Sequence, residues 1–301
     1  MTRRVTLDRE WATRPERGSV SIIQVIVWIA LKCGRRLARL LLYPICMYFI
    51  AVSPAARAAS RSYLGRVLER PPGMRELFHH YHTFAAVLLD RVFLLSERHS
   101  EFDIRIFGDE TVRTLAARGE GCLLFGAHVG SFEIIRTIGR RLPGLVVSMA
   151  MYEENARKIS AVLGAINPRL SKGIISLGRS EAMLEVADRV NRGEFVGFLA
   201  DRMLQGEEHV RMPFLGASAA FPLGPFRVAA SLRRPVVLMM GVYRGGRRYD
   251  VYFEPLADFT TVTREQRREA MLEAVRRFSV RIEQGCRDAP CNWFNFYDFW
   301  Q

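Results

Sequence analysis

The stretch Cys122-Leu-Leu-Phe-Gly-Ala-His128-Val-Gly-Ser-Phe-Glu133 joins an apolar run to a histidine, a glycine and a carboxylate. The apolar residues predict a strand that is buried on both faces. Gly130 permits a sharp bend after this strand, and Ser131 is a residue type that caps the first turn of a helix. The stretch therefore predicts a strand-to-helix turn that carries His128, with Glu133 in the first helical turn.

His128 and Glu133 form a candidate catalytic pair. On one continuous helix they would lie about 140° apart, so they can meet only if His128 is on the turn. Glu133 could then bind one imidazole nitrogen and leave the other to take a proton from a hydroxyl. Free backbone N–H groups at the helix start would offer an oxyanion site. The alternative is a satisfied core histidine, with Glu133 favoured by the helix dipole.

Strands and helices alternate through the chain after residue 96. Runs such as 194–200 are apolar on both faces, as in a sheet that helices cover on each side. We therefore expect an α/β fold with a mainly parallel central sheet flanked by helices, preceded by helices over 57–96. The expected strands are 102–107, 121–127, 144–149, 173–177, 195–200, 209–213, 235–242 and 249–254. The expected helices are 109–118, 131–142, 154–165, 180–192, 222–233 and 262–284.

Charged residues follow other predicted strands. The carboxyl ends of parallel strands share one edge of a sheet, so Asp201 is expected in the same crevice as His128. The pair Asp201-Arg202 is a candidate for orienting a substrate or binding phosphate, and its alternative is an exposed loop pair. Arg169 and Arg179 are further basic loop positions, for which a solvated side chain is the alternative.

The N-terminal segment, residues 1–56, combines basic and apolar residues. The first 70 residues hold a charge balance of +9 out of a total of +13, and the runs 18–31 and 40–56 are uncharged. Between the runs, helical spacing places four basic side chains on one face: Lys32, Arg35, Arg36 and Arg39. Such a segment lies in the headgroup plane or spans the bilayer once. A buried hairpin with a solvated basic face is the alternative. We expect a membrane-associated helical segment at 1–56, and an α/β domain at 57–301.

Several other classes of site lack support. The five cysteines are scattered without a CxxC motif, which predicts reduced thiols. No carboxylate or cysteine cluster accompanies His79, His80 and His82, so no metal site is expected. Nucleic-acid binding is disfavoured, because the positive charge is interleaved with apolar runs. The sequence also lacks the glycine patterns of nucleotide sites and of serine hydrolases.

Two apolar segments near the C-terminus have open interpretations. Residues 213–225 are rich in turn-forming residues and either line a groove for an acyl chain or form a buried loop that opens a helix. The tail, residues 292–300, holds six aromatic residues. It either packs onto the domain, which we favour, or lies in a membrane interface.

The motifs occur in a characteristic order: Trp11-Ala-Thr-Arg-Pro-Glu-Arg-Gly-Ser19, His128-x4-Glu133, Leu199-Ala-Asp201-Arg202, Phe221-Pro-Leu-Gly-Pro225 and the tryptophan-rich tail. In this order they resemble the bacterial lipid A late acyltransferases, the lauroyl and myristoyl transferases of the lysophospholipid acyltransferase-like group. The resemblance implies transfer of a fatty acyl group from acyl carrier protein or coenzyme A to a hydroxyl of lipid A or a related glycolipid. It implies no metal and no cofactor.

The resemblance also assigns residue roles. It implies His128 as the general base, Glu133 as its orienting partner and Asp201 as the family's later acid. Arg169 or Arg179 would be the family arginine. The enzyme would act at the cytoplasmic face of the bacterial inner membrane, with 57–301 as the acyltransferase domain. Two rival interpretations remain: a non-catalytic membrane-docked module that binds acyl chains, and an acyl thioesterase that uses water as the acceptor.

Overall fold

The computed structural model describes residues 20–139, 145–151, 173–177, 181–203 and 206–300. Its centre is a seven-stranded sheet of order β1-β9-β8-β2-β5-β3-β4, in which the β8–β9 pair is antiparallel and the other neighbours are parallel. The strands are β1 Asp103–Phe107, β2 Leu123–Gly126, β3 Val147–Met151, β4 Ile174–Ser176, β5 Phe195–Leu199, β8 Pro235–Gly245 and β9 Arg248–Asp258. The expected mainly parallel α/β sheet is confirmed.

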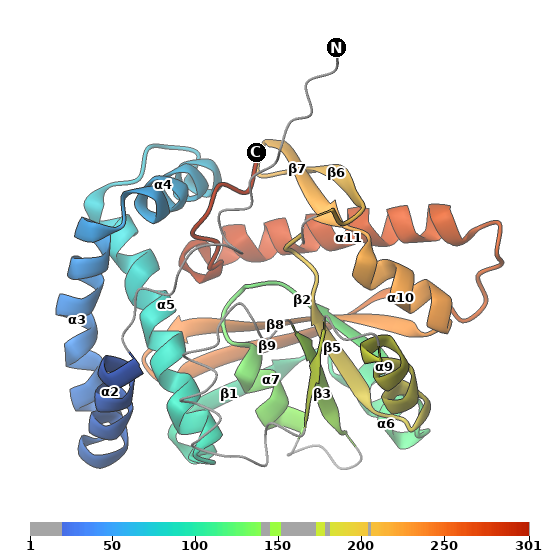
Figure 1. Ribbon diagram of the computed structural model, residues 1–301, viewed down its shortest axis with the longest axis horizontal. Coiled ribbons are helices and arrows are strands. Elements are labelled where there is room, and N and C mark those ends of the chain that lie inside the picture. The colour runs from blue at the N-terminus through green and yellow to red at the C-terminus, as the bar shows by residue number, and fades with distance from the viewer. Residues whose placement is uncertain (1–19, 140–144, 152–172, 178–180, 204–205, 301) are drawn as a thin grey trace.

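Helices cover both faces of this sheet (Figure 1). Along β2, Leu123 and Phe125 belong to one hydrophobic cluster and Leu124 to the other, because alternate strand side chains point to opposite faces. The first cluster contains residues of α4 Pro54–Leu68, α9 Ala182–Asn191, α10 Gly224–Leu232 and α11 Arg267–Asp288. The second contains residues of α2 Val20–Cys33, α3 Arg35–Val52, α5 Met74–Leu95, α6 Glu110–Ala117 and α7 Phe132–Gly139. Two buried faces explain why the strand sequences are continuously apolar.

One expected strand has a different place. The segment expected at 209–213 is β6 His209–Phe214, which pairs with β7 Ala217–Pro222 in a separate antiparallel ribbon. Leu215 and Gly216 both have positive φ and form the two-residue turn between the strands. The apolar segment 213–225 is thus mostly the second half of a hairpin, with Phe214 and Phe221 buried. The expected helix 154–165 lies outside the described residues.

The N-terminal helices differ from the expected continuous basic face. Gly34, with φ of +83°, separates α2 from α3, so Lys32 lies on a different helix from Arg35. Arg35 turns inward and donates two hydrogen bonds of 2.7 Å to Asp90 of α5. The Arg35 guanidinium, which was expected on the polar face, is only 9% exposed. Its burial is possible because the buried Asp90 carboxylate matches its charge.

The described helices were also compared with the requirements of a membrane span. None of them alone has both the length and the hydropathy that crossing a bilayer requires. Helices α3 and α4 satisfy those criteria only as a pair, and the pair is bent by 99°.

Candidate active site

The sheet register brings His128 and Asp201 together. Strands β2 and β5 are parallel neighbours, with Gly126 opposite Leu199. The pairing continues past the strand ends, since Ala200 N donates to Gly126 O at 2.8 Å. His128 is two residues after Gly126, and Asp201 is two residues after Leu199. The two residues therefore lie side by side at the carboxyl edge of the sheet.

The two side chains form a short hydrogen bond. His128 Nδ1 lies 2.7 Å from Asp201 Oδ1, and His128 N donates to Asp201 Oδ2 at 3.0 Å. An ionised carboxylate only accepts, so the proton of the neutral ring is on Nδ1 and Nε2 is a free acceptor. The His128 side chain is 24% exposed, whereas that of Asp201 is fully buried. The site therefore holds an accessible base on a fixed, buried acid.

The charges of the pair are set by their surroundings. Burial and the nearby Arg202 guanidinium lower the pKa of His128, and Asp201 only partly opposes them. Burial alone would raise the pKa of Asp201, but His128 and Arg202 hold this pKa well below its ordinary value. At neutral pH the pair is a neutral imidazole beside a carboxylate, which is the state that general-base chemistry requires.

Glu133, the partner expected for His128, instead pairs with Arg91 and Arg136. The predicted contact between His128 and Glu133 is therefore not found. Glu133 Oε1 lies 3.1 Å from Arg136 Nη1, and Glu133 Oε2 lies 3.5 Å from Arg91 Nη2. Glu133 is 6% exposed, and this burial is compensated by the two guanidiniums. The carboxylate on the His128 ring is therefore Asp201, which comes from the neighbouring strand.

The turn after β2 depends on close backbone contacts. Gly130 has φ of +63°, and a Cβ at this position would collide with the carbonyl oxygen of Gly241. The same oxygen accepts Ser131 N at 2.7 Å, which fixes the start of α7. Ser131 Oγ is buried and has no hydrogen-bond partner among the described residues, so it does not cap the helix as expected.

The C-terminal tail supplies site residues that the sequence analysis missed. Trp293 Nε1 donates to Asp201 Oδ2 at 3.0 Å, and Asn295 Nδ2 donates to the same oxygen at 3.3 Å. Both residues are buried, so the tail packs onto the domain here, as favoured above. A signal for this is present in the sequence: Asn295 interrupts an aromatic run, and a buried amide requires a polar partner.

The other predicted site residues have different outcomes. Asp201, predicted as a substrate-binding residue, is fully buried, and its oxygens accept hydrogen bonds from His128, Trp293 and Asn295. Arg202 is partly buried and donates to Asn295 Oδ1 and to Phe294 O, at 2.8 Å each. Arg169 and Arg179 lie outside the described residues.

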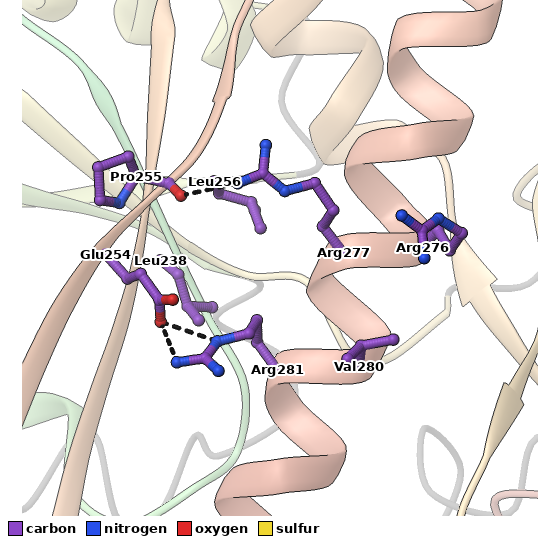
Figure 2. A pocket seen from close by; sticks show the side chains of 8 residues that line it. All are labelled: Leu238, Glu254, Pro255, Leu256, Arg276, Arg277, Val280 and Arg281. Atoms are coloured by element: carbon purple, nitrogen blue, oxygen red, sulfur yellow. Dashed lines mark hydrogen bonds and ion pairs between the residues drawn. The ribbon is translucent and has the colours of Figure 1, made fainter.

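A separate cavity of about 140 Å³ lies between β8, β9 and α11 (Figure 2). In Figure 2 the guanidinium of Arg281 points at Glu254, which it contacts at 2.6 Å, and Arg277 reaches the carbonyl of Pro255. Neither His128 nor Asp201 lines this cavity, and none of the tail residues does. Its polar groups are held mainly by contacts within its own wall, so it is not the space in which His128 would act.

Comparison with known proteins gives the family. A search of curated proteins finds no match. A family model described as bacterial lipid A biosynthesis acyltransferase matches residues 15–301, which include the β2 turn, the β5 end and the tail. The match covers nearly the whole chain, so this protein belongs to the bacterial lipid A biosynthesis acyltransferase family.

Proposed function

We propose that the protein transfers a fatty acyl group from a thioester of acyl carrier protein or coenzyme A to a hydroxyl of lipid A or a related glycolipid. The observation that carries this proposal is the 2.7 Å contact between His128 Nδ1 and Asp201 Oδ1 beneath a partly exposed ring. The family supports acyl transfer and implies a lipid acceptor.

The proposed reaction has two steps. His128 Nε2 removes the proton of the acceptor hydroxyl, and the oxygen attacks the thioester carbonyl to form a tetrahedral oxyanion. The C–S bond then breaks, and the imidazolium returns the proton to the leaving thiolate. Asp201 stays ionised throughout and stabilises the imidazolium. Backbone N–H groups in the first turn of α7, which have no acceptor within the helix, are candidates for stabilising the oxyanion.

The proposal places the enzyme on the cytoplasmic face of the bacterial inner membrane, docked through α2 and α3. The inner stripe of α3, which includes Ala38 and Leu42, is buried. The outer sides of both helices carry large exposed apolar residues: Val25, Trp28, Leu31, Leu37, Leu40, Tyr43, Met47, Tyr48 and Val52. Exposed Lys32 and Arg36 lie among them and would meet anionic headgroups. In Figure 1 these helices form one edge of the molecule.

The catalytic proposal is tested with full-length enzyme in detergent, a labelled acyl donor and a lipid acceptor. We expect His128→Ala to lower turnover on the order of 10³-fold or more while the melting temperature changes little. His209→Ala, at an exposed position on β6, is the matched control and should retain wild-type turnover. Comparing acyl carrier protein with coenzyme A thioesters identifies the donor.

Three results would contradict the proposal. Wild-type turnover by the His128 variant would remove the general base. Release of free fatty acid without a lipid acceptor would instead indicate a thioesterase, and acyl-chain binding without turnover would indicate a binding module.

The membrane proposal is tested with vesicles. Trp28→Ser combined with Leu40→Ser should weaken binding to phosphatidylglycerol vesicles by about tenfold or more, since two large apolar groups no longer leave water. Leu184→Ser, on α9, is the control, because Leu184 is equally exposed but lies on another part of the fold. Equal binding by the double variant and this control would refute docking through α2 and α3.

A further inference from the structure

Asp201 is a buried carboxylate whose oxygens are surrounded by N–H donors. Oδ1 accepts the His128 ring at 2.7 Å. Oδ2 accepts three donors: His128 N at 3.0 Å, Trp293 Nε1 at 3.0 Å and Asn295 Nδ2 at 3.3 Å. Two of these donors come from the C-terminal tail, more than 90 residues further along the chain. The acid is therefore fixed by a segment outside the sheet that carries it.

The backbone of the tail is paired with the turn that carries His128. Phe294 N donates to His128 O at 2.8 Å, and Gly130 N donates to Asn292 O at 2.8 Å. These two hydrogen bonds, one on each side of Trp293, fix the position of its indole relative to the turn that carries His128. The base and the donors to its partner are thus held in one backbone frame.

Arg202 determines which way the Asn295 amide faces. Arg202 Nε donates to Asn295 Oδ1 at 2.8 Å, and an arginine can only donate, so this atom must be the amide oxygen. The NH₂ group then faces Asp201 Oδ2 as a donor. A second bond from Arg202 Nη2 to Phe294 O, also 2.8 Å, holds the tail in the same position.

We propose that Trp293, Asn295 and Arg202 are positioning residues that hold the Asp201 carboxylate, and through it the His128 ring, in the orientation that leaves Nε2 free to take a proton. This inference rests on the proposed function for its effect on turnover. Its effect on the His128 ring can be measured independently of turnover.

A purely structural role for Trp293 must be distinguished from this one. The indole is fully buried and packs against Tyr63, Phe214 and Phe299, with ring centroids 4.9, 5.2 and 4.7 Å away. Removing it therefore loses packing as well as the N–H donor. Phe299→Leu is the matched control, because it weakens packing around the same indole and removes no polar contact to Asp201.

The test uses Trp293→Phe in the full-length enzyme, which keeps an aromatic ring and deletes the N–H. Without the Trp293 N–H, the Asp201 carboxylate and the ring that it orients are held less firmly in the reactive geometry, so kcat should fall roughly 10- to 100-fold while KM changes much less. With less of its charge offset, Asp201 should stabilise the imidazolium more strongly. The acid limb of the kcat/KM profile should therefore move to higher pH. Phe299→Leu should lower the melting temperature but leave kcat and the acid limb at wild-type values.

The second readout is the titration of His128 itself, followed by NMR in histidine-labelled protein and assigned with His128→Gln. We expect its pKa to rise in Trp293→Phe and also in Asn295→Leu, which removes the second tail donor. Asn295→Leu decides the matter if Trp293→Phe does not fold.

Unchanged kcat, an unmoved acid limb and a wild-type His128 titration in the folded variants would overturn the positioning role. If instead the wild-type enzyme transfers no acyl group but the titration shifts as expected, the proposed function fails and the positioning role stands.

Discussion

Replacing Asp201 by asparagine exchanges one carboxylate oxygen for an NH₂ group while the shape of the side chain stays the same. The contacts of Asp201 determine which oxygen is exchanged. Three N–H donors converge on Oδ2, whereas the His128 ring is the one donor to Oδ1 among the described residues. The amide oxygen of the variant will therefore occupy the Oδ2 position, because the opposite orientation would place its NH₂ against three donors. Its NH₂ then faces His128 Nδ1 and requires that nitrogen to be an acceptor.

The ring of Asp201→Asn is thus driven into the wrong tautomer. Its proton moves to Nε2, the nitrogen that receives the proton of the acceptor hydroxyl in the proposed reaction, and the imidazolium of that reaction loses its negative partner. Losses of this kind in a His–Asp pair are on the order of 10³- to 10⁴-fold in kcat, or about 4–5.5 kcal/mol. KM should change little, because the Asp201 side chain is fully buried and is not presented to a bound substrate.

Two measurements check this expectation. Single-turnover acyl transfer reports the chemical step, and ¹⁵N chemical shifts of the His128 ring report which nitrogen carries the proton. A variant that keeps kcat within tenfold of wild type, or that keeps an unprotonated Nε2, would refute the tautomer argument.

Three further predictions concern stability. Burial lowers the pKa of His80 to about 4, whereas an unfolded histidine titrates near 6.5. The free energy of unfolding should therefore fall by about 1.4 kcal/mol per pH unit as the pH drops from 6.5 towards 4. Denaturant titrations at several pH values should show that His80→Gln flattens this slope. Arg35→Met should cost about 3 kcal/mol by leaving Asp90 buried without its cation, and adding Asp90→Asn should recover part of the loss; equal melts for the single and double variants would contradict this. Gly130→Ala should abolish activity or folding through collision with a β8 carbonyl, whereas Gly119→Ala, with a similar φ of +66° and nothing within 4 Å, should cost only about 1 kcal/mol.

Much of the sheet could be predicted because its strands are buried on both faces. Continuous apolar runs produce a signal that loops and surface helices do not, and β1, β2 and β5 begin and end close to their expected bounds. The β6–β7 ribbon was incompletely predicted for a related reason. Its turn is Leu215-Gly216, and Gly216 is one of several glycines and prolines in 213–225, so the pattern indicates turns without showing which of them reverses the chain.

The partner of His128 could not be derived from local spacing. His128 and Glu133 are close in sequence, but Asp201 is 73 residues away and approaches only because β2 and β5 are neighbours in the sheet. The order of parallel strands depends on how helices pack across the whole sheet, and single strands do not encode it. The same limit applies to Trp293, whose indole reaches Asp201 from outside the sheet.

The structure nevertheless explains why Asp201 suits the ring better than Glu133. Both carboxylates are buried, and each must be compensated to stay ionised. Glu133 is paired with the guanidiniums of Arg91 and Arg136, and both of its oxygens are directed at these groups rather than at the imidazole. The Asp201 oxygens accept hydrogen bonds from neutral N–H groups of the tail, and Arg202, which hydrogen-bonds to the tail, acts on the carboxylate through its charge and helps to lower its pKa. Asp201 therefore lies as a carboxylate in direct contact with the imidazole, and in the proposed reaction this negative charge would stabilise the imidazolium formed by proton transfer.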